Sequence, residues 1–148
     1  MMKIGIASDH RGYRLKEYLK EVLPQLNYEV VDFGTTSEES TDYPDYAFVL
    51  GENVVSKNVD FGIAICGSGI GISIACNKVK GIRCAKVSNK EEAKITRIDN
   101  NSNIVAFSEK ILPQEAVEIV KAFVETPTSP EEKHQRRVNK IINYEETH

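Results

Sequence analysis

Short apolar runs alternate with longer amphipathic runs along the whole chain, and this alternation constrains the fold more than any other feature. Strands are predicted over residues 3–7, 28–34, 60–65, 81–87 and 103–107. Helices are predicted over residues 12–23, 44–55, about 70–78, about 88–98, 113–124 and about 130–143. Strands that alternate with helices are typical of βαβ units, and these build a parallel sheet covered on both faces.

The strand pattern also predicts where a ligand would bind. We expect one α/β domain over residues 1–148, with a doubly wound, five-stranded parallel sheet in the order 2-1-3-4-5 and a C-terminal helix. In that order ligands bind beyond the carboxyl ends of strands 1 and 3. Those ends carry "SDHRG" (8–12) and "CGSGIG" (66–71), the two stretches richest in polar and glycine residues.

Composition excludes several classes of partner. The net charge of −3 gives no general attraction to nucleic acid or to an anionic membrane. No apolar stretch approaches the roughly 20 residues of a membrane span, and no signal-peptide core precedes the first strand, so we expect a cytoplasmic protein. Three cysteines without a CxxC pair, and three histidines without HExxH spacing, predict no metal site.

The segment "CGSGIGIS" (66–73) is the most distinctive motif. Glycines at alternate positions allow successive backbone N–H groups to face a ligand, but they also suit a tight strand-to-helix turn. The segment matches neither GxGxxG nor a P-loop, which argues against a dinucleotide or nucleotide cofactor. It is not a GxSxG nucleophile elbow either.

Cys66 stands at the junction of that strand and the following helix. A helix N-terminus favours the thiolate, which suits proton abstraction beside a carbonyl or, with His10 as a partner, acyl transfer. A buried core thiol is the plainer alternative. We interpret Cys76 and Cys84 as core residues of that kind.

The last helix carries basic residues in a chain that is acidic. Lys133 and Arg137 lie four residues apart, and His134 and Arg137 three apart, so these side chains share one side of the helix. They form either an exposed charged face or a pocket for a small anion such as phosphate. His10 could complete that pocket. Asp9 could bind sugar hydroxyls or cap the first helix.

These motifs together resemble the ribose-5-phosphate isomerase B family, which includes the galactose-6-phosphate isomerase subunits. The resemblance implies a Rossmann-like three-layer αβα sandwich and a homodimer, or a dimer of dimers, with active sites at the subunit interface. It also implies a small-molecule sugar phosphate as substrate and aldose–ketose isomerisation through a cis-enediolate, without metal or cofactor. The matching segments are "SDHRGYRLK" (8–16), "DFGT" and "DYPDYA" (32–47), "CGSGIGISIACNKVKGIR" (66–83), "NNSNIVAF" (100–107) and "KHQRRVNKI" (133–141).

Carried over residue by residue, the resemblance implies roles for the glycine loop. Cys66 is the base that moves the proton between C1 and C2. Ser68, where family members have Thr or Ser, assists proton transfer at the sugar oxygens. The enediolate oxygen is stabilised by Asn100 and by backbone amides of the loop, which includes Gly67, Gly69, Ile70 and Gly71.

The resemblance also implies the binding residues. Asp9 and Tyr43 contact sugar hydroxyls, while His10 and Arg137 bind phosphate, with both subunits contributing to one site. Because Cys66 is present, the resemblance favours interconversion of ribose 5-phosphate and ribulose 5-phosphate. Isomerisation of a hexose 6-phosphate and a non-catalytic, flavodoxin-like binding module are the alternatives.

Three positions depart from the family pattern. In "RIDNN" (97–101), Asp99 replaces the histidine that is credited with opening the furanose ring. An ionised carboxylate near neutral pH accepts a proton but does not donate one. Lys110 and Lys133 replace two phosphate-binding arginines, and each keeps the charge without the planar fork.

Overall fold

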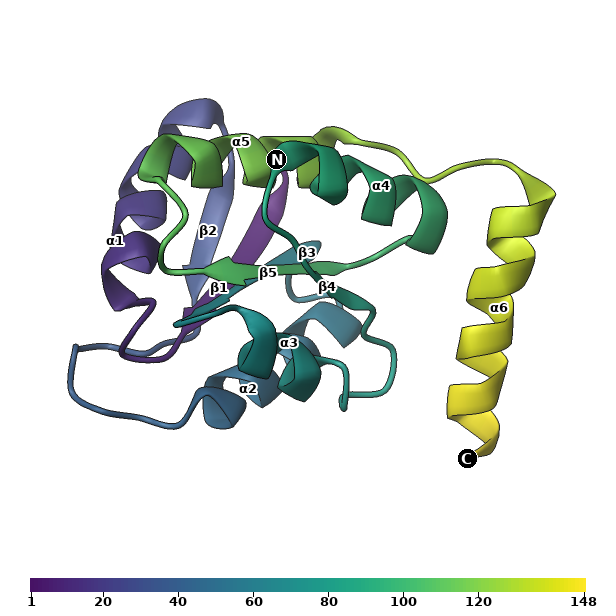
Figure 1. The fold of residues 1–148 in the computed structure, drawn as a ribbon, viewed down its shortest axis with the longest axis horizontal. Helices are drawn as coiled ribbons and strands as arrows, with labels where there is room; N and C mark the ends of the chain where they lie inside the picture. Colours follow the sequence, from purple (N-terminus) through teal and green to yellow (C-terminus); the bar gives the residue numbers. More distant parts are fainter.

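Five parallel strands form the centre of the molecule (Figure 1). The computed structural model describes residues 1–148. In the sheet the order is β2-β1-β3-β5-β4, with every neighbouring pair parallel. The strands are β1 (Lys3–Ser8), β2 (Glu29–Asp32), β3 (Phe61–Cys66), β4 (Cys84–Lys86) and β5 (Ile104–Ser108).

Helices cover both faces of this sheet, which confirms the predicted α/β class. Figure 1 shows α1, α5 and α4 on one face and α2 and α3 on the other. Alternate strand residues separate into two apolar cores, so that Ile63 and Ile65 pack under the first layer and Ala64 under the second. The helices are α1 (Tyr13–Val22), α2 (Tyr43–Val55), α3 (Ile70–Cys76), α4 (Lys90–Asn100), α5 (Pro113–Glu125) and α6 (Glu132–Thr147), with a 3-10 turn at Leu23–Leu26.

The predicted order of the last two strands is wrong. β5, not β4, lies beside β3, with Ile65 opposite Phe107 and Cys66 opposite Ser108. Residues 104–107 have no exposed surface, which suits a strand with a neighbour on each side. β4 has only three residues, none of them fully buried, and it takes the edge, where its exposed lysine keeps water contact.

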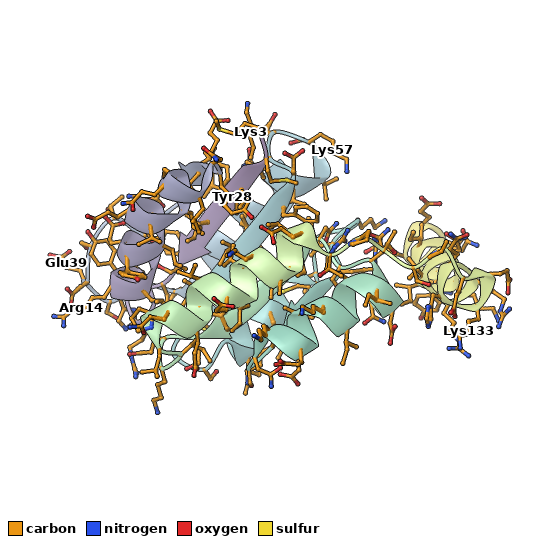
Figure 2. The ribbon with its side chains drawn as sticks, turned by 90° about the horizontal axis from the view of Figure 1, so that it is seen from above. Lys3, Arg14, Tyr28, Glu39, Lys57 and Lys133 are labelled. Atoms are coloured by element: carbon orange, nitrogen blue, oxygen red, sulfur yellow. The ribbon has the colours of Figure 1, made fainter.

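The last helix lies apart from the sandwich, at the amino ends of the strands (Figure 1). Val138 is its one buried residue, and it runs from Glu132 to Thr147, longer than predicted. Its far end is held by Glu145, whose Oε2 accepts a 2.8 Å hydrogen bond from the Gly81 backbone N–H. Seen from above, α6 stands beside the body, with Lys133 pointing outward (Figure 2). None of the helices has both the length and the apolar character that crossing a membrane requires.

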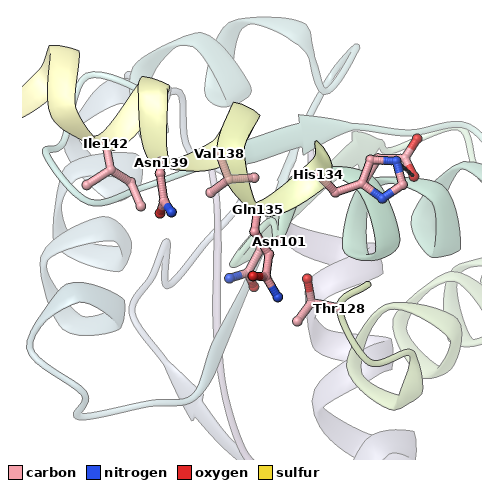
Figure 3. Close-up of a pocket in the computed structure, with 8 residues that line it drawn as sticks. Asn101, Thr128, His134, Gln135, Val138, Asn139 and Ile142 are labelled. Carbon is pink, nitrogen blue, oxygen red and sulfur yellow. Dashed lines mark ion pairs between the residues drawn. The ribbon is translucent and has the colours of Figure 1, made fainter. Parts of the chain in front are cut away.

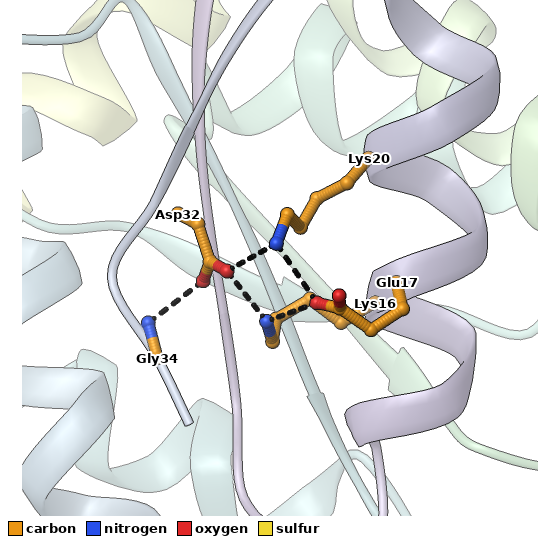
Figure 4. A network of polar contacts seen from close by, with 5 residues as sticks. All are labelled: Lys16, Glu17, Lys20, Asp32 and Gly34. Carbon is orange, nitrogen blue, oxygen red and sulfur yellow. Dashed lines mark hydrogen bonds and ion pairs between the residues drawn. The ribbon is translucent and has the colours of Figure 1, made fainter. Parts of the chain in front are cut away.

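Four charged side chains between α1 and β2 form a closed network (Figure 4). Lys16 is completely buried, and its Nζ lies 2.8 Å from Asp32 Oδ2 and 2.8 Å from Glu17 Oε2. Lys20 Nζ lies 2.7 and 2.9 Å from the same two oxygens. Burial alone would raise the pKa of Asp32, but bonds from both lysines and from the Gly34 N–H outweigh it and lower that pKa.

This network predicts sensitivity to acid. The pKa of the Asp32 carboxyl in the folded protein lies below its ordinary 3.8. The ionised carboxylate therefore stabilises the fold above pH 3.8, and this stabilisation is lost as the pH falls through the lowered pKa. The Glu17 carboxyl behaves alike, because its bond with Lys16 lowers its pKa. We expect Asp32→Asn to make the free energy of unfolding fall less steeply as the pH is lowered. Urea titration from about pH 3 to 7 measures this slope. An unchanged acid slope would contradict this.

Candidate active site

The carboxyl ends of β1, β3 and β5 meet at one edge of the sheet, and their loops are tied together there. The Glu109 backbone N–H donates to the Cys66 carbonyl at 2.9 Å, and the Ser108 hydroxyl donates to the Gly67 carbonyl at 2.7 Å. The Asp9 N–H donates to the Ile65 carbonyl at 3.3 Å. The edge at which a ligand was predicted to bind is therefore formed by three strands.

Cys66 is nearly buried at the centre of this edge, with 4% of its surface exposed. The Gly69 N–H donates to its Sγ at 3.2 Å, and the Ile70 N–H donates to Ser68 Oγ at 3.1 Å. This turn depends on Gly69, whose φ is +80°; a Cβ there would lie 2.6 Å from the Phe107 carbonyl carbon. No histidine is among the hydrogen-bond partners of Cys66, so the pair needed for acyl transfer is not formed.

Asp9 and His10 follow β1 beside this loop. Asp9 Oδ1 accepts from the backbone N–H groups of Arg11 and Gly12, at 3.0 and 3.1 Å, so Asp9 does hold the turn before α1. All its side-chain bonds go to Oδ1, which leaves Oδ2 for a ligand. His10 Nδ1 accepts from the Thr41 N–H at 3.2 Å, so a neutral ring carries its proton on Nε2.

Two more predicted residues reach the same edge. Tyr43 begins α2 and lies over the glycine loop, since a Cβ on Gly71 would fall 2.7 Å from Tyr43 Cζ. Lys110 follows β5, is exposed and forms none of the ion pairs. Arg11, by contrast, is neutralised by Glu109, with Nε and Oε2 2.6 Å apart.

The remaining predicted residues lie at the opposite edge. Asp99 and Asn100 end α4, which runs back from the carboxyl to the amino ends of the strands. The Asn100 carbonyl accepts a 3.0 Å bond from Arg83 Nε, just before β4 begins. A strand of five or six residues spans about 17–20 Å, and that length separates Asn100 from the Cys66 of the same chain.

Asp99 lines a cavity of about 260 Å³ between α4, the segment after α5 and α6 (Figure 3). His134 shares this cavity, and its Nε2 lies 3.6 Å from Asp99 Oδ1. His134 Nδ1 is buried without a hydrogen-bond partner. Arg137, three residues further along α6, is exposed and does not line this cavity.

Lys133 and Arg137 belong to the outer side of α6. Lys133 Nζ lies 3.6 Å from Glu131 Oε2, and both side chains are more than half exposed. Arg137 is exposed and makes none of the ion pairs, whereas its neighbour Arg136 pairs with Glu132. Arg137 is therefore a cation that the chain itself does not neutralise.

Sequence reasoning missed Ser108 and Glu109 as neighbours of the glycine loop and His134 as the neighbour of Asp99. The first two were missed because strand 4 was expected beside strand 3, which would have placed Val87 and Ser88 there. The signal was the fully apolar run 104–107, which marks an interior strand.

The other two cysteines are structural. Cys76 has no exposed surface, and Cys84 packs against the same core. A bond with the Cys76 thiol, together with burial, raises the pKa of the Cys84 thiol well above its ordinary value, so that thiol stays protonated. No group of three or more His, Cys, Asp or Glu side chains is arranged to hold a metal ion.

Comparison with known proteins decides the family. The family model described as Ribose/Galactose Isomerase matches residues 4–141. This chain belongs to that family. The putative sugar phosphate isomerase YwlF of Bacillus subtilis is 48% identical, over 98% of each chain. The ribose-5-phosphate isomerase B structure from Clostridium thermocellum superposes with a TM-score of 0.94, at 44% identity over 99% of each chain.

A third relative bears on the ligand. The ribose-5-phosphate isomerase B of Mycoplasma genitalium, in a structure described as having bound ribulose-5-phosphate, has a TM-score of 0.90 and 38% identity, over 98% of this chain and 97% of that one. Members of the ribose/galactose isomerase family are aldose–ketose isomerases. The expectation of an enzyme is thereby confirmed, and the alternative of a non-catalytic binding module is not supported.

Proposed function

We propose that this chain interconverts ribose 5-phosphate and ribulose 5-phosphate as a homodimer in which each active site takes residues from both copies. One observation carries the proposal: the functional residues fall into two groups at opposite edges of the sheet. Cys66 and the glycine loop lie at one edge, and Asp99 and Asn100 at the other. A second copy completes a site when the edge of its sheet at which the strands begin packs against the edge of the first sheet at which the strands end.

The surface supports association of two copies. Ile70 and Ile74 on α3 are more than half exposed, and they lie four residues apart on one side of that helix. Ile141 and Tyr144 on α6 are exposed to a similar degree. Apolar side chains gathered in this way are typical of surfaces that a partner covers.

In this proposal Cys66 is the base for the isomerisation. Its thiolate removes the proton from C2 of the open-chain aldose and returns it to C1, through a cis-enediolate. The loop amides and Asn100 of the second copy stabilise the charge that develops on the oxygen. Ser68 assists the proton transfer between the two oxygens.

The remaining residues hold the substrate. Asp9, through Oδ2, and Tyr43 bind sugar hydroxyls. Phosphate binding is assigned to His10, which presents its Nε2–H, and to the cations Lys110, Lys133 and Arg137. Lys110 and Arg137 are free of intramolecular ion pairs, so neither has to break one when phosphate arrives.

Ring opening is assigned to Asp99 together with His134. The anomeric hydroxyl must lose a proton and the ring oxygen must gain one, and a carboxylate performs only the first step. His134, 3.6 Å away, can do both near neutral pH. The pair thus offers the donor that Asp99 lacks.

The direct test is a panel of pentose and hexose phosphates in deuterium oxide. We expect turnover of ribose 5-phosphate, with deuterium entering C2 of the aldose because the proton held by Cys66 exchanges with solvent before a hydrogen is returned to carbon. Turnover of a hexose 6-phosphate alone would replace the substrate in this proposal. That second candidate is motivated by Asp99, the position at which the chain departs from its family.

Shared sites predict complementation between inactive subunits. In a mixed dimer of Cys66→Ala and Asn100→Ala chains, one site carries both defects and the other carries none. Random association makes half the dimers mixed, so an equal mixture should recover about a quarter of wild-type activity. A mixture of Cys66→Ala with Ser68→Ala is the control, because both changes lie in the same loop and every site keeps a defect. Equal, negligible activity in both mixtures would contradict shared sites.

Loss of Arg137 should weaken binding more than chemistry, because the phosphate is remote from the reacting carbons. We expect Arg137→Ala to raise KM for ribose 5-phosphate about 10- to 100-fold, with a smaller fall in kcat. The matched control is Arg136→Ala, which removes an arginine already paired with Glu132 and should change KM less than about twofold. A similar KM for the two variants would remove Arg137 from the phosphate site.

A further inference from the structure

Lys16 is a charged group that the proposed chemistry does not use. It has no exposed surface, although removing an ammonium group from water is costly unless the charge is fully paired. A buried ion pair seldom adds stability over apolar residues of the same volume. Such a pair more often fixes one local geometry. The other contacts of Asp32 show which geometry it fixes here.

Asp32 ends β2, and its two oxygens have different partners. Oδ2 is held by Lys16 at 2.8 Å, while Oδ1 accepts the Gly34 backbone N–H at 2.8 Å (Figure 4). Gly34 has a φ of +104°, and a Cβ there would lie 2.8 Å from the Tyr46 ring. Asp32 therefore holds a turn that only glycine can make, and the turn sends the chain from β2 over the carboxyl edge.

The chain from the end of β2 to the start of α2, residues 33–42, is called here the β2–α2 loop, and it contacts the segment that carries His10 at two points. Its first part pairs with Ser8, whose N–H donates to the Gly34 carbonyl at 2.7 Å and whose carbonyl accepts the Thr35 N–H at 2.8 Å. Its far end supplies the Thr41 N–H that donates to His10 Nδ1. The loop thus holds His10 through the preceding backbone and through the ring itself.

We propose that Asp32, held by the buried Lys16, is a positioning residue for His10. Through the Gly34 turn it fixes the β2–α2 loop, and the Thr41 N–H of that loop occupies His10 Nδ1, which leaves Nε2 to bind an incoming anion. The role of His10 in phosphate binding rests on the proposed function. The connection from Asp32 to His10 is a property of the folded chain and does not depend on the substrate.

Three variants separate positioning from general stability. Asp32→Ala removes the acceptor for the Gly34 N–H, and we expect faster hydrogen exchange at the Thr41 amide and a KM for ribose 5-phosphate raised about tenfold. Asp32→Asn keeps one acceptor oxygen, but its NH2 group then faces either the two lysine ammonium groups or the Gly34 N–H, so we expect a partial loss in both readings. Asp60→Ala is the matched control, because that carboxylate also accepts a backbone N–H, from Lys3 at 2.8 Å, but at the opposite edge. It should leave both readings unchanged.

A double-mutant cycle tests whether the effect passes through His10. If it does, Asp32→Ala should raise KM little further in a His10→Ala background. The proposal is overturned if the full effect persists in that background, or if Asp32→Ala leaves Thr41 exchange at the wild-type rate. Thr41 exchange can be read in a protein without activity, and Asp32→Asn, which keeps the volume of the side chain, is the variant to measure if Asp32→Ala does not fold. A wild-type protein that isomerises no pentose phosphate would refute the proposed function, while Thr41 exchange would still decide the role of Asp32.

Discussion

Cys66→Ala should abolish isomerisation of ribose 5-phosphate while the protein remains folded. The thiol lies nearly buried at the carboxyl edge and accepts the Gly69 N–H, and in the proposed mechanism it carries the proton between C2 and C1. A positioned general base contributes about 10²–10⁴-fold, so kcat/KM should fall by at least that factor. Initial rates in both directions, and the loss of deuterium incorporation at C2, are the measurements.

The matched control for this variant is Cys76→Ala. It removes a thiol of the same size from the core on the same side of the sheet, but from the far end of α3. We expect some loss of stability and little change in kcat. Turnover near the wild-type level in Cys66→Ala would refute the enediolate mechanism with this base, whatever the control shows.

Gly69→Ala should be the most damaging change in the glycine loop. Its positive φ is unfavourable for alanine, and the added Cβ would meet the Phe107 backbone, which cannot move without disturbing β5. Backbone strain and overpacking together should cost about 2–4 kcal/mol of unfolding free energy. The remaining folded protein should also lose activity, because the Gly69 N–H would no longer meet Cys66 Sγ.

Gly67→Ala provides the comparison within the same loop. A Cβ at that position meets nothing closer than 3.7 Å, and the backbone there does not need a positive φ. Its free energy of unfolding, measured by urea titration, should change by about 0.5 kcal/mol or less. If both glycine variants were equally stable, the close approach of Gly69 to β5 would not be a constraint on the loop.

Local pattern was enough to predict most elements and the edge of the sheet at which Asp9 and Cys66 meet. β1 and β3 are marked by apolar runs, and the residues that follow them, Asp9 and Cys66, lie together because parallel strands end at the same edge. Element ends were less accurate. β4 was expected over residues 81–87 but pairs only over 84–86, since Gly81 has a positive φ and the Cys84 backbone also binds the Asn77 side chain.

The sequence by itself determined the α/β class, the family and the position of Cys66, because these follow from local periodicity and from motifs of consecutive residues. Three features were decided only by the tertiary structure. β5 takes the interior position because residues 104–107 are apolar on both faces, and Lys16 is buried because Asp32 and Glu17 meet it from two elements. The residues proposed for the site fall at opposite edges because α4 runs back from the carboxyl ends of the strands to their amino ends, which places Asp99 and Asn100 far from the Cys66 of the same chain.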